Sequence, residues 1–161
     1  MEEAYHVGVV GSGTCSAELY QLARKIGYEI GRHGWTLICG GLGGIMEGAS
    51  RGCIEAGGMT VGLLPGFRKQ EANPYIRTAI PTGLGEGRNF LVVRASDILV
   101  AISGGHGTLS EIALGLKTGR TVVGIRTFDH LEGIVRASTP EMVIKLIESK
   151  KISGSSGYCG L

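Results

Sequence analysis

Residues 98–111 read ILVAISGGHGTLSE, an apolar run, then a turn with three glycines, then the start of a helical pattern. The run at 98–102 predicts a buried strand, and the pattern that continues to Lys117 predicts a helix. Glycines let backbone N–H groups approach an anion closely, and a helix N-terminus adds unpaired donors and about half a positive charge. Thr108 adds a hydroxyl group, and Glu111 adds a carboxylate one turn later. The stretch therefore predicts a phosphate-binding turn beside an acid.

Apolar runs and helical patterns alternate along the rest of the chain. Nearly uninterrupted apolar strands separated by helices indicate a parallel sheet covered on both faces. The predicted fold class is thus α/β, a three-layer Rossmann-like parallel sheet with helices on both faces, in a single domain over residues 1–152 and a flexible tail over 153–161. The expected strands are 6–10, 36–39, 59–64, 76–80, 98–102 and 121–125. The expected helices are 16–33, 45–56, 88–95, one that follows the glycine turn and runs to Lys117, and 140–150, the last with Thr139 as its N-cap.

The composition excludes several classes of protein. With 43% hydrophobic and 19% charged residues, the 161-residue chain is typical of a soluble globular protein. A net charge of +2 is too small to indicate a nucleic-acid partner, and no apolar run is long enough to span a membrane. The acidic N-terminus is unlike a secretory signal, so we expect a cytoplasmic protein.

Cysteine and histidine usage argues against a metal site. The four cysteines share no C-x-x-C spacing and the four histidines are scattered, so we expect neither a metal nor a disulfide. Cys15 precedes the first predicted helix, where a helix N-terminus lowers the pKa of a thiol. Because no partner histidine is visible, we interpret Cys15 as structural.

Three glycine-rich turns follow predicted strands, at residues 11–13, 40–44 and 104–107. In open parallel sheets, ligands bind outside the carboxyl ends of the strands, so these turns predict one shared pocket. The first turn has Ser16 where a dinucleotide fingerprint has Gly or Ala, and no acidic residue follows the second strand, which disfavours a nicotinamide cofactor. Gly11 and Ser12 either contact the ligand or only let the chain reverse.

Plainer explanations exist for the other candidate residues. The glycines at 104–107 also suit helix–strand packing alone, Thr108 also suits a helix cap, and Glu111 also suits a first-turn acid favoured by the helix dipole. His106 suits either a ligand contact or a solvent-facing turn, and Arg88 suits either a phosphate partner or a surface cation. The joint spacing of glycines, hydroxyl and carboxylate after a buried strand favours the binding interpretation.

At these residues the chain resembles a known superfamily. Residues 103–111 resemble the Pro-Gly-Gly-x-Gly-Thr-x-x-Glu signature of LONELY GUY-type phosphoribohydrolases, once labelled lysine decarboxylases, and residues 40–47 resemble their glycine turn after the second strand. The resemblance implies hydrolysis of the N-glycosidic bond of a nucleoside 5′-monophosphate, without a cofactor, by a homodimer or higher homo-oligomer. It implies a catalytic pair, Arg88 and Glu111, and a phosphorylated nucleotide-like ligand whose phosphate is held by Gly105, Gly107 and Thr108. With the neighbouring glycine turns, the predicted ligand-binding residues are Gly11, Ser12, Gly40, Gly41, Gly43, Gly44, Met46, Gly104, Gly105, His106, Gly107 and Thr108.

Two departures from the hydrolase pattern suggest an alternative. Ser103 replaces the proline of the signature, and residues 87–89 (GRN) replace a His-x-Arg-Lys pattern. These features are similar to a sister branch that includes molybdenum cofactor carrier proteins, which implies a non-catalytic carrier of molybdopterin. Lysine decarboxylation itself is disfavoured, because pyridoxal phosphate needs a lysine in a pocket and the lysines here fall on predicted helix faces and in loops.

Overall fold

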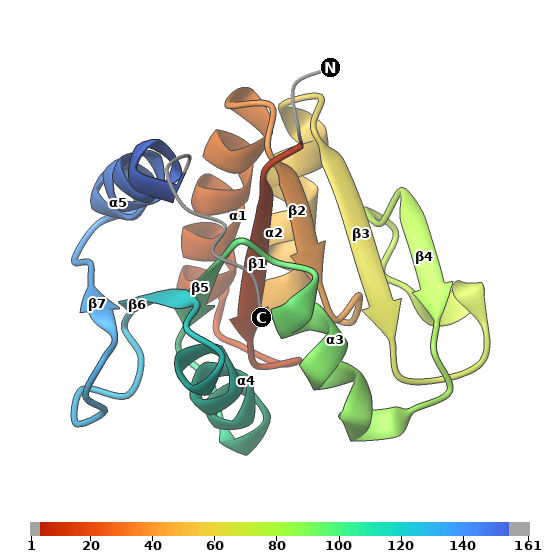
Figure 1. The fold of residues 1–161 in the computed structure, drawn as a ribbon. Coiled ribbons are helices and arrows are strands. Elements are labelled where there is room, and N and C mark those ends of the chain that lie inside the picture. The colour runs from red at the N-terminus through yellow and green to blue at the C-terminus, as the bar shows by residue number, and fades with distance from the viewer. Residues whose placement is uncertain (1–3, 155–161) are drawn as a thin grey trace.

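The computed structural model describes residues 4–154, which form one sheet of seven parallel strands in the order β4-β3-β2-β1-β5-β6-β7 (Figure 1). The strands are β1 (His6–Gly11), β2 (Thr36–Cys39), β3 (Met59–Leu64), β4 (Thr78–Pro81), β5 (Ile98–Ile102), β6 (Thr121–Ile125) and β7 (Val135–Arg136). The α-helices are α1 (Ala17–Arg32), α2 (Ile45–Glu55), α3 (Arg88–Arg94), α4 (His106–Lys117) and α5 (Pro140–Gly154). Short 3-10 turns lie at Lys69–Glu71 and Gly85–Gly87.

Two hydrophobic cores cover the two faces of the sheet. One core packs α1, α2 and α5 against the sheet and includes Ile26 and Ile147. The other core packs α3 and α4 against the opposite face, through Val92 and Ile112. Figure 1 accordingly shows α1 and α2 behind the sheet and α3 and α4 in front of it. The predicted three-layer Rossmann-like class is confirmed.

Helices α1 and α2 touch through their backbones. A Cβ atom added at Gly27 would lie 1.9 Å from the carbonyl oxygen of Ala49, and one added at Gly52 would lie 1.9 Å from that of Arg24. Both positions therefore exclude any side chain. The contact joins the helices that follow β1 and β2 into one rigid block.

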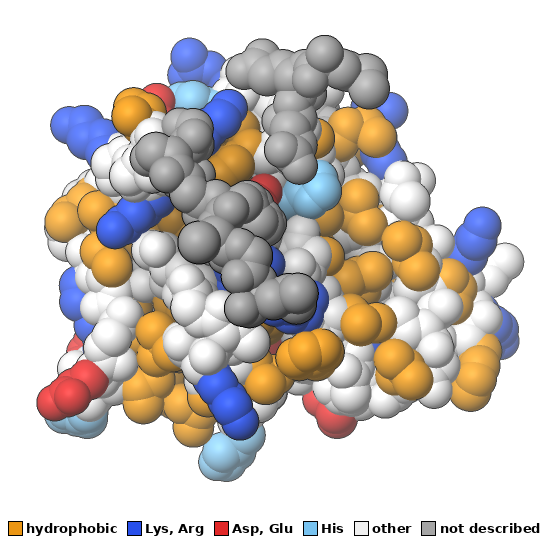
Figure 2. Space-filling model, in the orientation of Figure 1, with side chains coloured by type: hydrophobic (Ala, Val, Ile, Leu, Met, Phe, Trp, Pro, Cys, Tyr) orange, Lys and Arg blue, Asp and Glu red, His pale blue; other side chains and the backbone are white. Residues whose placement is uncertain are grey.

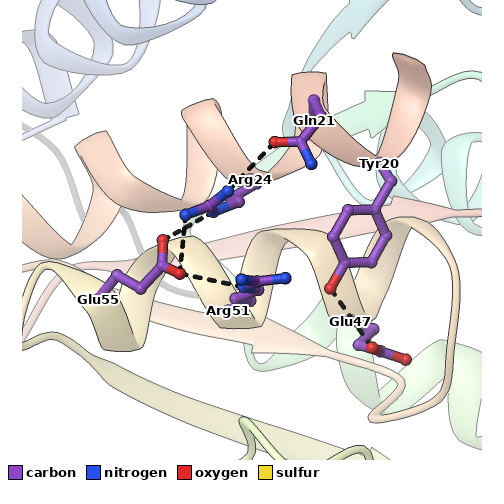
Figure 3. Close-up of polar contacts among 6 residues, drawn as sticks. All are labelled: Tyr20, Gln21, Arg24, Glu47, Arg51 and Glu55. Carbon is purple, nitrogen blue, oxygen red and sulfur yellow. Dashed lines mark hydrogen bonds and ion pairs between the residues drawn. The ribbon is translucent and has the colours of Figure 1, made fainter. Parts of the chain in front are cut away.

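A row of polar side chains borders this helix contact (Figure 3). The guanidinium of Arg24 donates to both carboxylate oxygens of Glu55, at 2.7 and 2.9 Å, and Arg51 donates to Glu55 at 3.0 Å. Nearer the start of α2, the Tyr20 hydroxyl donates to Glu47 at 3.3 Å. The row stabilises the α1–α2 block along its outer side.

The structure departs from the predicted elements in the less regular parts of the chain. Strand β4 begins at Thr78 rather than residue 76, because a turn precedes it. In this turn the side-chain oxygen of Asn73 accepts the Tyr75 N–H at 3.0 Å, and its carbonyl oxygen accepts the Ile76 N–H at 3.2 Å. The sequence did not predict β7, whose two residues are too short for a pattern. Helix α5 runs to Gly154, two residues into the predicted tail, while residues 155–161 of that tail lie outside the described residues.

The strand order brings the three glycine turns together. Strand β1 pairs with β2 on one side and with β5 on the other, and all three run in the same direction. The chain progresses one way from β1 to β4 and the other way from β5 to β7, so the direction changes between β1 and β5. A crevice at such a change is where open α/β sheets bind ligands. Within residues 4–154, no helix combines the length and apolar character that crossing a bilayer requires.

Candidate functional site

The turns after β1 and β2 lie directly against each other. The Ile45 N–H donates to the Ser12 carbonyl at 3.0 Å, and a Cβ atom at Gly44 (φ +62°) would lie 2.4 Å from that same oxygen. A Cβ atom at Gly43 would lie 3.0 Å from the Gly13 carbonyl oxygen. These glycines therefore let two turns pack without intervening side chains.

Two predicted ligand contacts have evident packing roles. A Cβ atom at Gly11 would lie 2.5 Å from the Ile45 side chain and 2.7 Å from the Ile102 carbonyl oxygen. Met46 is buried in the core on the α1 and α2 face of the sheet. Direct contact of Gly11 or Met46 with a ligand stays a prediction.

Arg88, at the start of α3, packs against the β2 turn. A Cβ atom at Gly40 would lie 2.2 Å from its Nη1 atom, so the guanidinium rests on the bare backbone of that turn. The neighbouring Gly41 (φ +76°) faces Leu64 instead. Arg88 is a buried cation and not the surface residue that was its plainer explanation, because only 9% of its side chain is exposed. Its Nη1 donates to Asn89 Oδ1 at 3.0 Å, and its buried Nε has no hydrogen-bond partner among the described residues.

Glu111 faces Arg88 from α4. Its Oε1 lies 3.9 Å from Arg88 Nη1, and only 8% of its side chain is exposed. Burial raises the pKa of Glu111 to about 7, against the opposing effect of Arg88 and with a further contribution from Glu86. The structure thus brings together the two residues of the predicted catalytic pair. Near neutral pH this carboxyl group populates both its acid and its base form, as a proton-transfer group requires.

The β5 turn presents open backbone rather than packed backbone. A Cβ atom at Gly105 or Gly107 would meet nothing within 4 Å, and both residues are exposed. Gly104 (φ +121°) packs against Thr108, which is buried. Helix α4 begins at His106 with Gly105 as its N-cap, so Thr108 is not the capping residue that was its plainer explanation. The backbone donors of this helix start are therefore free for an anion.

A groove of 540 Å³ runs between α3 and α4 beside this turn. His106 is exposed and lines it, together with Asn89, Phe90 and Ser110. Asn89 Nδ2 donates to Ser110 Oγ at 3.3 Å, and Ser110 Oγ donates to the Gly107 carbonyl at 2.7 Å. This chain of hydrogen bonds ties α3 to the start of α4 and so fixes Arg88 relative to the turn.

Asn73 supports the site and escaped the sequence analysis. It is buried, its N–H donates to the Gly41 carbonyl at 2.8 Å, and its Nδ2 donates to the Leu42 carbonyl at 2.9 Å. It thereby clamps the β2 turn from a segment predicted only as a loop. The sole available signal was an Asn-Pro pair at residues 73–74, which favours a turn.

Ser103, the first residue of the signature, has an unusual backbone. Its φ of +52° lies in the left-handed region, whereas proline is fixed near −65°. The replacement of the signature proline therefore accompanies a different turn conformation. Across the described chain the other non-glycine residue with positive φ is Arg126, at the end of the neighbouring strand β6.

The thiols and acids do not form a metal site in the part of the chain that the structure describes. No group of three or more His, Cys, Asp or Glu side chains there could hold a metal ion. Of the described cysteines, Cys15, Cys39 and Cys53 are all free. Burial, together with the Glu47 carboxylate, raises the pKa of the Cys15 thiol, so the lowering considered from its helix position is wrong.

Comparison with known proteins gives relatives along most of the chain. The model of the SLOG cluster4 family matches residues 4–153. The molybdenum cofactor binding protein from the phototrophic bacterium Rippkaea orientalis is 35% identical with a TM-score of 0.89, covering 94% of this chain and 99% of that chain. The Moco carrier protein from Chlamydomonas reinhardtii is 30% identical with a TM-score of 0.86 and the same coverage.

A hydrolase is also among the sequence relatives. The cytokinin riboside 5′-monophosphate phosphoribohydrolase of Mycobacterium tuberculosis is 30% identical over 130 residues, which cover 73% of this chain and 68% of the hydrolase. The hydrolase relatives that the signature predicts and the cofactor-carrier relatives that its departures suggest are thus both found.

Proposed function

Because the chain belongs to the SLOG cluster4 family, we propose that it binds a small phosphate-bearing ligand at the crevice between β1 and β5 and serves as a molybdenum cofactor carrier. The observation that carries this proposal is the open backbone of Gly105 and Gly107 at the start of α4. Molybdopterin carries a phosphate group, and a helix start with free N–H donors binds phosphate. The cofactor-binding relatives support the proposal because they match nearly their whole length.

The substitutions around Arg88 also favour a carrier over a hydrolase. Asn89 stands where the hydrolase pattern has a lysine, and its side chain turns back to accept from Arg88 and donate to Ser110. A neutral amide thus replaces a cation beside Arg88. Arg88 itself remains suited to hold a phosphate or another anionic group, because its guanidinium is fixed and its Nε is unpartnered.

A second candidate function is hydrolysis of a nucleoside 5′-monophosphate, and the Arg88–Glu111 pair favours it. The bond between ribose C1′ and the base nitrogen would break, with its electron pair leaving on the base. The ionised Glu111 would stabilise the cationic ribose, or its acid form would protonate the departing base. Water would then add at C1′ and lose a proton, giving ribose 5-phosphate and free base.

The two functions are separated by what the protein retains and what it releases. We expect gently purified protein to contain molybdenum by mass spectrometry and a fluorescent oxidised pterin, and Gly105→Ala to lose both. Protein that acquires neither, even when mixed with free molybdenum cofactor, contradicts the carrier function. Release of adenine from AMP, followed by chromatography and abolished in Glu111→Gln but not in the remote Glu29→Gln, would establish the hydrolase instead.

We also propose that the protein is a homo-oligomer. Exposed apolar side chains gather on the side of the molecule that bears β3, β4 and α3, as Figure 2 shows; they include Met59, Ile80, Leu84 and Phe90. Exposed apolar surfaces suit a symmetric self-contact, because each patch meets a copy of itself. Sedimentation should give at least twice the 16.8 kDa chain mass, and Phe90→Asp should shift the protein toward the monomer. A monomer at micromolar concentration contradicts this part of the proposal.

A further inference from the structure

A charged pair beside the signature turn has no part in the function described so far. Arg126 follows β6, Glu18 lies in the first turn of α1, and their side chains form an ion pair. Strand β5 lies between β1 and β6 in the sheet, so the pair joins the elements that follow its two neighbours. The turn of residues 103–105 begins at the same edge, where β5 ends.

The backbone around Arg126 is fixed to that turn. The Ser103 N–H donates to the Ile125 carbonyl at 3.2 Å, and Thr127 Oγ1 donates to the Ser103 carbonyl at 2.7 Å. Both chain neighbours of Arg126 therefore hold Ser103, the first residue of the signature. Ser103 and Arg126 both have positive φ, at +52° and +50°. Backbone strain of this kind persists only where the surroundings impose it, and it gathers at functional sites.

The Arg126–Glu18 ion pair is accessible to solvent, so another anion can replace the carboxylate. The Arg126 side chain is 55% exposed and that of Glu18 is 72% exposed. Exposed ion pairs contribute little to stability, so holding this pair together does not explain a strained arginine. A guanidinium that pairs with a carboxylate can also pair with a phosphate, whose oxygens accept the same N–H donors.

Resting on the proposed function, we propose that Arg126 is a second phosphate-binding arginine, which Glu18 holds until a phosphate monoester at the β5 turn displaces the carboxylate. Arg126 then determines specificity for the phosphorylated ligand, and Glu18 acts as a competitor of that ligand. The two residues of one ion pair consequently have opposite effects on binding. A purely structural pair would give effects of the same sign.

Calorimetric titration with AMP and with adenosine tests this inference on the full chain. We expect Arg126→Ala to weaken AMP binding about tenfold, the loss typical of one hydrogen-bonded charged contact. Glu18→Ala should tighten it by up to about fivefold, the upper range for an exposed ion pair. The gain should vanish in the Arg126→Ala background, and adenosine binding should be unchanged throughout. Arg32→Ala and Glu29→Ala, an exposed pair at the other end of α1, are the matched controls and should leave AMP binding unchanged.

A glycine variant separates binding from folding. Arg126→Gly removes the cation and also the cost of a left-handed side-chain residue, so its melting temperature should not fall below that of the wild type. Weak AMP binding by this stable variant supports the inference. Unchanged binding in Arg126→Ala and Arg126→Gly, or equal losses in the Glu18 and Arg126 variants, would overturn it while leaving the proposed function intact. If the wild type binds neither AMP nor inorganic phosphate, the phosphate-binding turn on which the proposed function rests is overturned together with this inference.

Discussion

The two halves of the crevice use glycine in opposite ways. On the β1 and β2 side, an added Cβ atom at Gly44 would collide with the Ser12 backbone, and the helices beyond are packed just as closely. On the β5 side, Gly105 and Gly107 face open space, and the strained residues are Ser103 and Arg126. The first half is thus closely packed except at Gly13, and the second half holds the exposed backbone donors. Glycine-rich turns of similar sequence therefore differ in whether they serve packing or a ligand.

The largest expected effect lies in the closely packed half. Gly27→Ala places a methyl group 1.9 Å from the Ala49 carbonyl oxygen, so α1 and α2 must separate. We expect a loss of about 3–4 kcal/mol in the free energy of unfolding, at the upper end for overpacking. Urea unfolding followed by circular dichroism measures it. Gly13→Ala is the matched control, since a Cβ atom there meets nothing within 4 Å. Equal stability of the two variants would contradict the description of this half as closely packed.

Ser103→Pro tests the strained turn of the open half. Proline cannot reach a φ of +52°, and it removes the N–H that donates to the Ile125 carbonyl. Although proline is the residue of the family signature, Ser103→Pro should therefore lower the free energy of unfolding by about 3 kcal/mol. Ser103→Gly removes the same side chain without this constraint and should be at least as stable as the wild type. A Ser103→Pro protein of wild-type stability would show that the turn readily adopts the other conformation.

Glu111 gives the open half a pH dependence. Its folded pKa of about 7 lies above the ordinary 4.5, so the folded state binds more protons between these values than the unfolded state does. The contribution of Glu111 to stability is therefore fully present below about pH 4.5 and is lost as the pH rises through 7. The difference in the free energy of unfolding between Glu111→Gln and the wild type should shift by about 2 kcal/mol in favour of the variant from pH 5 to pH 8. Urea unfolding of both proteins at the two pH values measures this shift. A constant difference would place the Glu111 pKa near its ordinary value.

Gly105→Ala should have the smallest effect on stability of these variants and a large effect on ligand binding. Gly105→Ala adds a methyl group in open space at a negative φ of −116°, so stability should change by less than about 0.5 kcal/mol. The methyl group should obstruct an anion at the start of α4 and weaken phosphate or AMP binding about tenfold or more. Calorimetry on a variant with an unchanged melting temperature measures this. Undiminished binding would move the ligand away from the turn.

The sequence predicted the parts of this architecture that depend on local pattern. Apolar runs followed by glycines located β1, β2 and β5 with their turns, and the strand alternation placed those turns at one edge. The family resemblance paired Arg88 with Glu111, which the structure brings within 3.9 Å. That pairing could not be derived from local pattern, because it depends on how α3 packs on α4.

What the sequence missed depends on contacts between distant loops. Asn73 holds the turn of Gly41, 32 residues away, and nothing in its own segment indicates this. The backbone of Ser103 is set by hydrogen bonds to Ile125 and Thr127, so its strain is invisible in the signature itself. Arg126 likewise occurs in a segment without periodic pattern. Each of these residues acts across the carboxyl edge of the sheet, where neighbours in space are remote in the chain.

The backbone contact between α1 and α2 also bears on how the molecule fluctuates. The close backbone contacts at Gly27 and Gly52 join the first three strands and their two connecting helices into one βαβαβ unit. Neither helix can move away from the sheet without the other. Hydrogen exchange of the amides in this unit should proceed through global unfolding. Amides of residues 103–108 and 126–134 should exchange much faster, either directly where the N–H has no partner or through small local openings, so ligand entry needs to disturb only this part of the molecule.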